Sequence, residues 1–151
     1  MNKRENSRSD VQKSIEKYML EQIRIMLNDS TLVGDSKIIF NDGKTEICPD
    51  IYSEQNRIIG EIHAHIGRLK GSQPDKIASD ILKMLLYEKK TEFEWKKYIA
   101  ICDIDEYEQL RGNSFLAEAI REYGIELLLV DLPKELRDKL LKCMKRQNLL
   151  E

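Results

Sequence analysis

The sequence lacks the long apolar segments that would place it in or across a membrane. No apolar run approaches the roughly 20 residues that a membrane-spanning helix needs. The first residues are polar and do not lead into the apolar core of a signal peptide. We therefore expect a cytoplasmic protein with no membrane partner.

Cysteine is scarce as well. Cys48, Cys102 and Cys143 are far apart in the chain, and no Cys-x-x-Cys pair points to zinc or redox chemistry. All three stand among apolar residues, and disulfides are rare in proteins of the cytoplasm. We therefore expect three reduced cysteines that act as packing residues.

The chain has no excess of basic residues, and its formal net charge is −2. A dedicated nucleic-acid-binding protein usually carries such an excess, because basic side chains displace counterions from phosphates. Binding to nucleic acid would therefore depend on a local basic patch. Arg68, Lys70 and Lys76 form one candidate patch, although runs of charge this common are more often a solvated face.

The residues that are present are those of a folded domain. The chain has 151 residues, of which 41% are hydrophobic and 34% are charged. This length suffices to bury a core without disulfides or a structural metal. Residues 1–9 are polar and predict a flexible N-terminal tail, and residues 10–151 predict a single α/β domain.

Apolar spacing of three and four residues predicts helices, and short apolar runs predict strands. A first helix follows Asp10, which can cap it, and ends near residues 28–30. The later elements are expected in this order: strands at 38–40, 46–53 and 57–66, a helix at 72–89, a strand at 98–102, a helix at 116–123, a strand at 125–130 and a helix at 133–147. The last helix has one apolar face, which either covers the sheet or pairs with a second subunit in a homodimer.

The most informative segment surrounds Glu61, His63 and His65. These residues alternate with apolar ones, as in a strand with one buried face, so their side chains share the other face. Asp50 lies eleven positions before Glu61, after Pro49, in another expected strand. Carboxylates and imidazoles are ordinary ligands of divalent metals, so Asp50, Glu61, His63 and His65 are the candidate metal ligands.

This order of elements resembles the PD-(D/E)XK nuclease superfamily over roughly residues 10–131. The resemblance implies a restriction-endonuclease-like α-β-β-β-α-β core, with a mixed central sheet flanked by helices. It also implies that Asp50 and Glu61, with ten residues between them, hold a catalytic Mg²⁺ or Mn²⁺. A glutamate of the first helix sometimes joins such a site, and here Glu16 and Glu21 are the candidates, although neither falls clearly on the apolar stripe.

The chain departs from the superfamily at the motif lysine, because the position two residues after Glu61 is His63. Within the resemblance, the missing amine is supplied by Lys70 or Lys76, or His63 replaces it directly. Neutral imidazole has a reference pKa of about 6.5 and can accept a proton near neutrality. It can also bind a metal, in which case Mn²⁺, Fe²⁺ or Zn²⁺ would be favoured over Mg²⁺.

The expected function is the metal-dependent hydrolysis of phosphodiester bonds in nucleic acid, with DNA as the expected substrate. The catalytic candidates are Asp50, Glu61, His63, Lys70 and Lys76. Two alternatives remain open. The chain is a catalytically inactive binding module that keeps the nuclease fold, or a non-nuclease metal protein that uses Glu61, His63 and His65.

Overall fold

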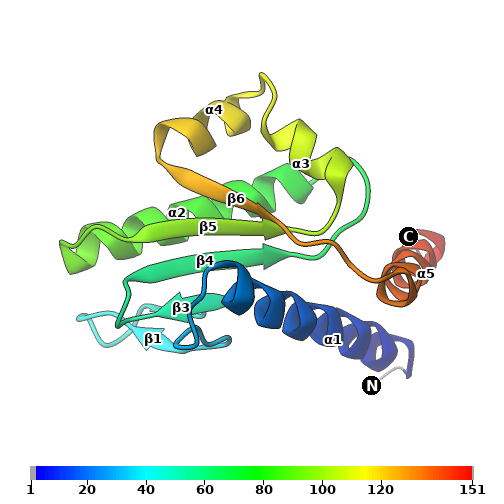
Figure 1. Ribbon diagram of the computed structural model, residues 1–151, viewed down its shortest axis with the longest axis horizontal. Coiled ribbons are helices and arrows are strands. Elements are labelled where there is room, and N and C mark those ends of the chain that lie inside the picture. The colour runs from blue at the N-terminus through cyan, green and yellow to red at the C-terminus, as the bar shows by residue number, and fades with distance from the viewer. Residues whose placement is uncertain (1–2, 151) are drawn as a thin grey trace.

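A mixed four-stranded sheet lies between two layers of helices (Figure 1). The structure is a computed structural model that describes the backbone of residues 3–150 and the side-chain surroundings of residues 10–147. The strands lie in the order β3 (Ile51–Ser53), β4 (Ile58–His63), β5 (Lys96–Ile101) and β6 (Ile125–Leu129). β3 is antiparallel to β4, whereas β4, β5 and β6 are mutually parallel. The expected α/β class with a mixed, helix-flanked sheet is therefore confirmed.

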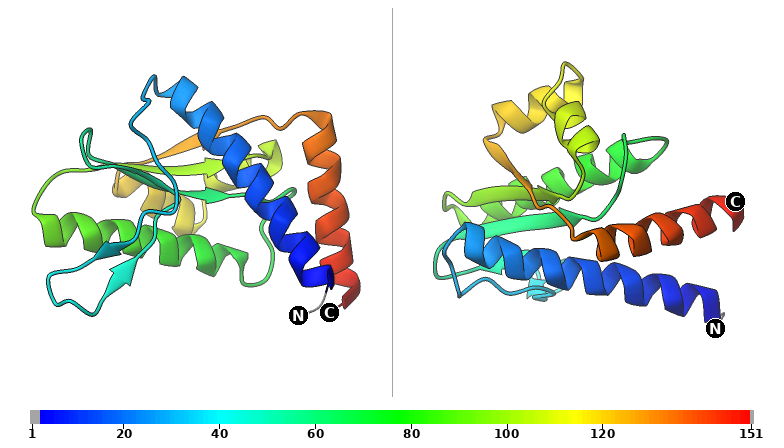
Figure 2. Two further views of the ribbon diagram at one scale, coloured as in Figure 1. Left: turned by 90° about the horizontal axis from the view of Figure 1, so that it is seen from below. Right: turned by 45° about the vertical axis from the view of Figure 1, so that its right-hand side comes forward.

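One face of the sheet is covered by α1 (Lys3–Met26), and α5 (Lys134–Leu150) lies beside α1 (Figure 2). Ile15, Met19 and Ile23 recur on α1 at intervals of four, and all three are fully buried. They pack with Ile58 and Ile62 of β4 and with Leu140 of α5. The apolar face of α5 therefore packs beside α1, near the carboxyl ends of the parallel strands (Figures 1 and 2).

The other face of the sheet carries α2 (Gln73–Thr91), α3 (Ile104–Leu110) and α4 (Phe115–Glu122). Ile77, Ile81 and Met84 form the buried stripe of α2 and pack on Ile59 and Ile99 of the sheet. A separate hairpin, made of β1 (Ile38–Ile39) and β2 (Glu46–Ile47), closes the edge of the same core. Within residues 3–150, no helix combines the length and the apolar character needed to cross a bilayer.

Gly60 permits the close approach of β4 and β5. A Cβ atom at this position would lie 2.8 Å from the carbonyl oxygen of Tyr98, closer than side-chain atoms normally come. The residue next to Glu61 is therefore one at which only glycine fits without displacing the backbone.

Several sequence expectations need correction. β4 is buried on both faces, not on one, because it lies inside the sheet with helices above and below. The strand expected over 46–53 is two short strands separated by Pro49, which cannot donate a ladder hydrogen bond. α1 begins at Lys3, upstream of the cap expected at Asp10, and residues 1 and 2 of the expected tail lie outside the described residues. α3 was not predicted.

Candidate functional site

Asp50 and Glu61 face each other at the end of the β3–β4 pair. Ile51 pairs with Gly60, and continuing this antiparallel register by one residue puts Asp50 opposite Glu61. The backbone N–H of Ile62 donates a hydrogen bond to Oδ2 of Asp50 at 2.9 Å, which fixes this carboxylate against β4. Two neighbouring strands therefore bring the two acids together, as the spacing in the sequence predicted.

The environment of Glu61 disfavours its charge. Its side chain is only 6% exposed, and it lies beside the carboxylates of Asp50 and Asp80. Burial, then contact with Asp50, then the negative charge of Asp80 raise the pKa of Glu61 to about 9. The surroundings of Glu61 therefore favour its protonated form, even with the ammonium group of Lys83 nearby.

Lys83 of α2 is the cation nearest to these acids. Its Nζ lies 3.5 Å from Oε1 of Glu61 and 3.2 Å from Oδ1 of Asp80. Burial opposes the charge of Lys83, but the two carboxylates outweigh it and raise the pKa of Lys83. The ammonium group thus neutralises part of the negative charge of the cluster.

Lys76 lies at the edge of the same cluster. Its Nζ is 3.5 Å from Oδ2 of Asp80, and its side chain is largely exposed. Among the described side chains, Lys83 is the lysine in contact with Glu61, whereas the sequence had pointed to Lys70 or Lys76. Asp80 itself is buried although it lies on the apolar stripe of α2, between Ile77 and Ile81.

A cleft of about 800 Å³ opens over these acids. It is lined by both Asp50 and Glu61, by Glu16 of α1, and by Gln73 at the start of α2. Burial and the negative charge of Asp50, which lines the same cleft, raise the pKa of Glu16. Of the two helix glutamates considered from the sequence, Glu16 faces the cleft and Glu21 is exposed and does not line it.

The rim of the cleft is basic on one side. The residues predicted as a basic patch all line it: Arg68, Lys70 and Lys76. All three are exposed, and the first two lie on the loop between β4 and α2. The cleft thus combines acidic groups at its floor with cationic groups at its edge.

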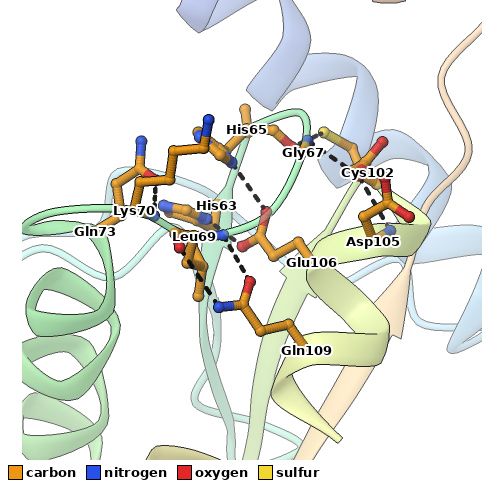
Figure 3. A network of polar contacts seen from close by, with 12 residues as sticks. His63, His65, Gly67, Leu69, Lys70, Gln73, Cys102, Asp105, Glu106 and Gln109 are labelled. Carbon is orange, nitrogen blue, oxygen red and sulfur yellow. Dashed lines mark hydrogen bonds and ion pairs between the residues drawn. The ribbon is translucent and has the colours of Figure 1, made fainter. Parts of the chain in front are cut away.

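This loop is held in place by hydrogen bonds to α3. The N–H of Leu69 donates to Oε1 of Gln109 at 2.6 Å, and Oδ2 of Asp103 accepts from Gly67 at 3.0 Å. On the other side of the loop, the N–H of Lys70 donates to Oε1 of Gln73 at 2.8 Å. These hydrogen bonds tie the loop that carries Lys70 to α3 and to the start of α2 (Figure 3).

His63 and His65 also line the cleft, but their Nδ1 atoms point to Glu106 of α3 (Figure 3). Nδ1 of His63 contacts Oε1 of Glu106 directly, and Nδ1 of His65 lies 3.6 Å from Oε2 of the same carboxylate. Glu106 is fully buried. Glu106 was missed in the sequence because the short helix that carries it was missed.

The described side chains support a small hard cation better than a histidine-rich metal site. Within residues 10–147, no three His, Cys, Asp or Glu side chains are arranged to hold a metal ion. Mg²⁺, however, keeps several waters and is commonly bound by one or two carboxylates together with substrate phosphates. Asp50 and Glu61 are a pair of carboxylates of this kind, and burial followed by the neighbouring acids raises the pKa of Glu61.

The cysteines fit the packing expectation only in part. Cys102 is buried, its thiol donates to the carbonyl oxygen of His65 at 3.4 Å, and burial raises its pKa to about 12. A thiol with so high a pKa is unreactive at neutral pH. Cys48 is exposed, which contradicts the expectation that it packs in the core, and Cys143 is half-buried.

Comparison of the chain with protein-family models, with curated proteins and with solved structures gives no match. Any functional assignment therefore depends on the geometry and electrostatics of the cleft.

Proposed function

We propose that this chain is a metal-dependent nuclease-like protein that hydrolyses phosphodiester bonds of nucleic acid, with DNA as the first substrate to test. The observation that carries the proposal is the Asp50–Glu61 pair, which is held on adjacent strands at the floor of a cleft with a basic rim. Two carboxylates forced together on rigid strands are costly unless a cation occupies the space between them.

The arrangement of the elements supports the resemblance to the PD-(D/E)XK superfamily. A helix precedes an antiparallel strand pair that carries the two acids, and α2 then crosses over to the parallel strand β5. The cleft lies beyond the carboxyl end of β4, where ligands of open α/β sheets usually bind. A restriction-endonuclease-like core is therefore part of the proposal.

Asp50 and Glu61 would hold Mg²⁺ or Mn²⁺, and Glu16 lines the same cleft as this pair. When bound, such a cation lowers the pKa of a coordinated water and neutralises charge that develops on phosphate oxygens. Lys83 adds a fixed positive charge next to Glu61. In this proposal Lys83 takes the electrostatic part of the motif lysine that is absent after Glu61.

The rim residues Arg68, Lys70 and Lys76 would contact the phosphate backbone. Such contacts orient the strand over the acids without reading its sequence. A homodimer and a cytoplasmic location stay predictions from the sequence.

The test is cleavage of labelled DNA and RNA, single- and double-stranded, with Mg²⁺, with Mn²⁺ and with EDTA. We expect metal-dependent cleavage that is lost in Asp50→Asn and Glu61→Gln and retained in Glu126→Gln, an exposed glutamate of β6. Absence of cleavage with either metal, together with nucleic-acid binding, would instead favour the inactive binding module. Cleavage that survives Asp50→Asn would contradict the proposed site.

A further inference from the structure

Glu106 is a buried carboxylate shared by two imidazoles. It comes from α3, which is 43 residues away from His63 in the sequence, and none of its surface is exposed. The rings of His63 and His65 stack with centroids 5.5 Å apart, and both direct Nδ1 toward this one carboxylate. In the view of Figure 3, the His63 ring lies between Glu106 and the loop that carries Lys70.

His65 and Glu106 approach each other without forming a hydrogen bond. Oε2 of Glu106 and Nδ1 of His65 are both buried without a hydrogen-bond partner among the described residues. Their separation of 3.6 Å is too long for a hydrogen bond. Buried polar atoms are rarely left unpaired in structures, and exceptions often mark a functional site.

The opposite ring nitrogens face the cleft. Both histidines line the cleft, whereas Glu106 does not. Because Nδ1 of each ring is directed at Glu106, Nε2 lies on the opposite side of the ring, away from that carboxylate.

The contact with Glu106 decides which nitrogen of His63 carries the hydrogen. When Glu106 is ionised it can only accept hydrogen bonds, and Nδ1 of His63 then donates to it. In a neutral imidazole, Nε2 is then left with its lone pair. An ionised carboxylate at this place would therefore fix the tautomer of His63 as well as the orientation of its ring.

We propose that Glu106 is a positioning residue that holds His63 as the Nδ1–H tautomer, so that Nε2 presents a lone pair to the cleft. There Nε2 accepts a hydrogen bond from the water that attacks the phosphodiester and orients it. The role of this water as the attacking nucleophile rests on the proposed function. The tautomer of His63 does not depend on any reaction.

The test is long-range ¹H–¹⁵N correlation spectroscopy on protein labelled at its two histidines, without metal and at a pH above 7.5. His65→Gln leaves one imidazole and assigns the signals of His63. In the wild-type protein we expect a protonated Nδ1 and an unprotonated Nε2 at His63. A wild-type spectrum with the hydrogen on Nε2 of His63 would overturn the proposal without any variant of Glu106.

Glu106→Gln replaces the carboxylate with a group that can both donate and accept, so we expect the signals of His63 to move toward a mixture of tautomers. Glu108→Gln, an exposed position on the same helix, should leave them unchanged. Glu106→Asp keeps the carboxylate and should keep the Nδ1–H tautomer. An unaltered His63 spectrum in a folded Glu106→Gln protein contradicts the proposal.

Cleavage kinetics separate this inference from the proposed function. Loss of such an orienting partner typically costs about 10- to 100-fold in activity, and we expect it in kcat, with KM unchanged, for Glu106→Gln. If the expected tautomer is found but the wild-type protein cleaves nothing, the positioning role of Glu106 stands and the nuclease proposal fails. If Asp50-dependent cleavage is found and Glu106→Gln cleaves at the wild-type rate, the positioning role fails instead.

Discussion

Lys83 Nζ lies 3.5 Å from Oε1 of Glu61, so the ammonium group on α2 and the carboxyl group on β4 form a direct pair at the floor of the cleft. This pair joins the acids on the sheet to Asp80 on the helix that crosses over it. The balance of charge in the cleft therefore depends on a lysine that the sequence motif did not identify.

Replacement of Lys83 should impair cleavage more than replacement of the two rim lysines. Lys83→Met removes the positive charge next to Glu61, and loss of one such electrostatic contact typically lowers kcat about 10²- to 10³-fold. Lys70→Met and Lys76→Met should mainly raise KM, because these side chains lie at the edge of the cleft. Steady-state kinetics would measure kcat and KM for the three variants. Equal losses of kcat in all three would contradict the role given to Lys83.

Binding of a divalent cation should release a proton. With a pKa of about 9, Glu61 is protonated in the metal-free protein at pH 7, and a cation between it and Asp50 would displace that proton. Calorimetric titration with Mn²⁺ in two buffers of different ionisation enthalpy should give close to one proton released per ion. In Glu61→Gln this release should disappear, and a wild-type protein that binds Mn²⁺ with no proton release would contradict the protonated state of Glu61.

The free energy of unfolding of the metal-free protein should depend on pH because the pKa of Glu61 is raised. Because burial and neighbouring acids raise the pKa of Glu61, its contribution is greatest below its unfolded pKa of 4.5 and is lost as the pH rises toward 9. Between pH 5 and 8, the stability of the wild type relative to Glu61→Gln should fall by up to about 1.4 kcal/mol per pH unit. Acids whose pKa is lowered, such as Asp103, are already ionised in this window and do not mask the trend.

Urea unfolding in EDTA at several pH values measures this difference. Glu126→Gln is the matched control, since the residue is exposed and should show no such trend relative to the wild type. A difference between wild type and Glu61→Gln that is flat from pH 5 to 8 would mean that Glu61 is ionised in the folded protein.

The basic rim should govern the salt dependence of nucleic-acid binding. Each phosphate contact contributes about −0.9 to the slope of log affinity against log salt for duplex DNA. The double variant Arg68→Gln/Lys70→Gln should therefore reduce the slope by about 2, as measured by fluorescence anisotropy in the Asp50→Asn background with EDTA. Lys89→Gln/Lys90→Gln removes the same charge from the far end of α2 and should leave the slope unchanged.

The acid pair could be predicted from the sequence because its geometry is local. Asp50 directly precedes β3 and Glu61 lies in β4, and a short turn joins these two strands, so the separation of the two acids in sequence fixes their register. α2, β5 and β6 were also predictable, because each has an apolar run or stripe of ordinary length.

The contribution of α3 could not be predicted in the same way. This helix has seven residues, and its first residue, Ile104, is exposed, whereas the acidic Glu106 is buried. Burial of a charged residue in place of an apolar one removes the periodic pattern by which helices are recognised. The contact of Glu106 with His63 is long-range and has no signal in a single sequence.

The sequence does contain a feature that points to Lys83. Asp80 stands on the apolar face of α2 beside Ile77 and Ile81, where a lone carboxylate would be costly without partners. Two lysines lie within one helical turn of Asp80: Lys76, four residues before it, and Lys83, three residues after it. A charged residue inside an apolar stripe is thus a better guide to this site than the motif spacing alone.

The most direct test of the account is a crystal structure of the protein with Mn²⁺, using the anomalous signal of the ion. We predict a peak bound by carboxylate oxygens of both Asp50 and Glu61, with the ammonium group of Lys83 still beside Glu61. A structure in saturating Mn²⁺ with no ion between these two acids, or with the ion bound only at His63 and His65, would contradict it.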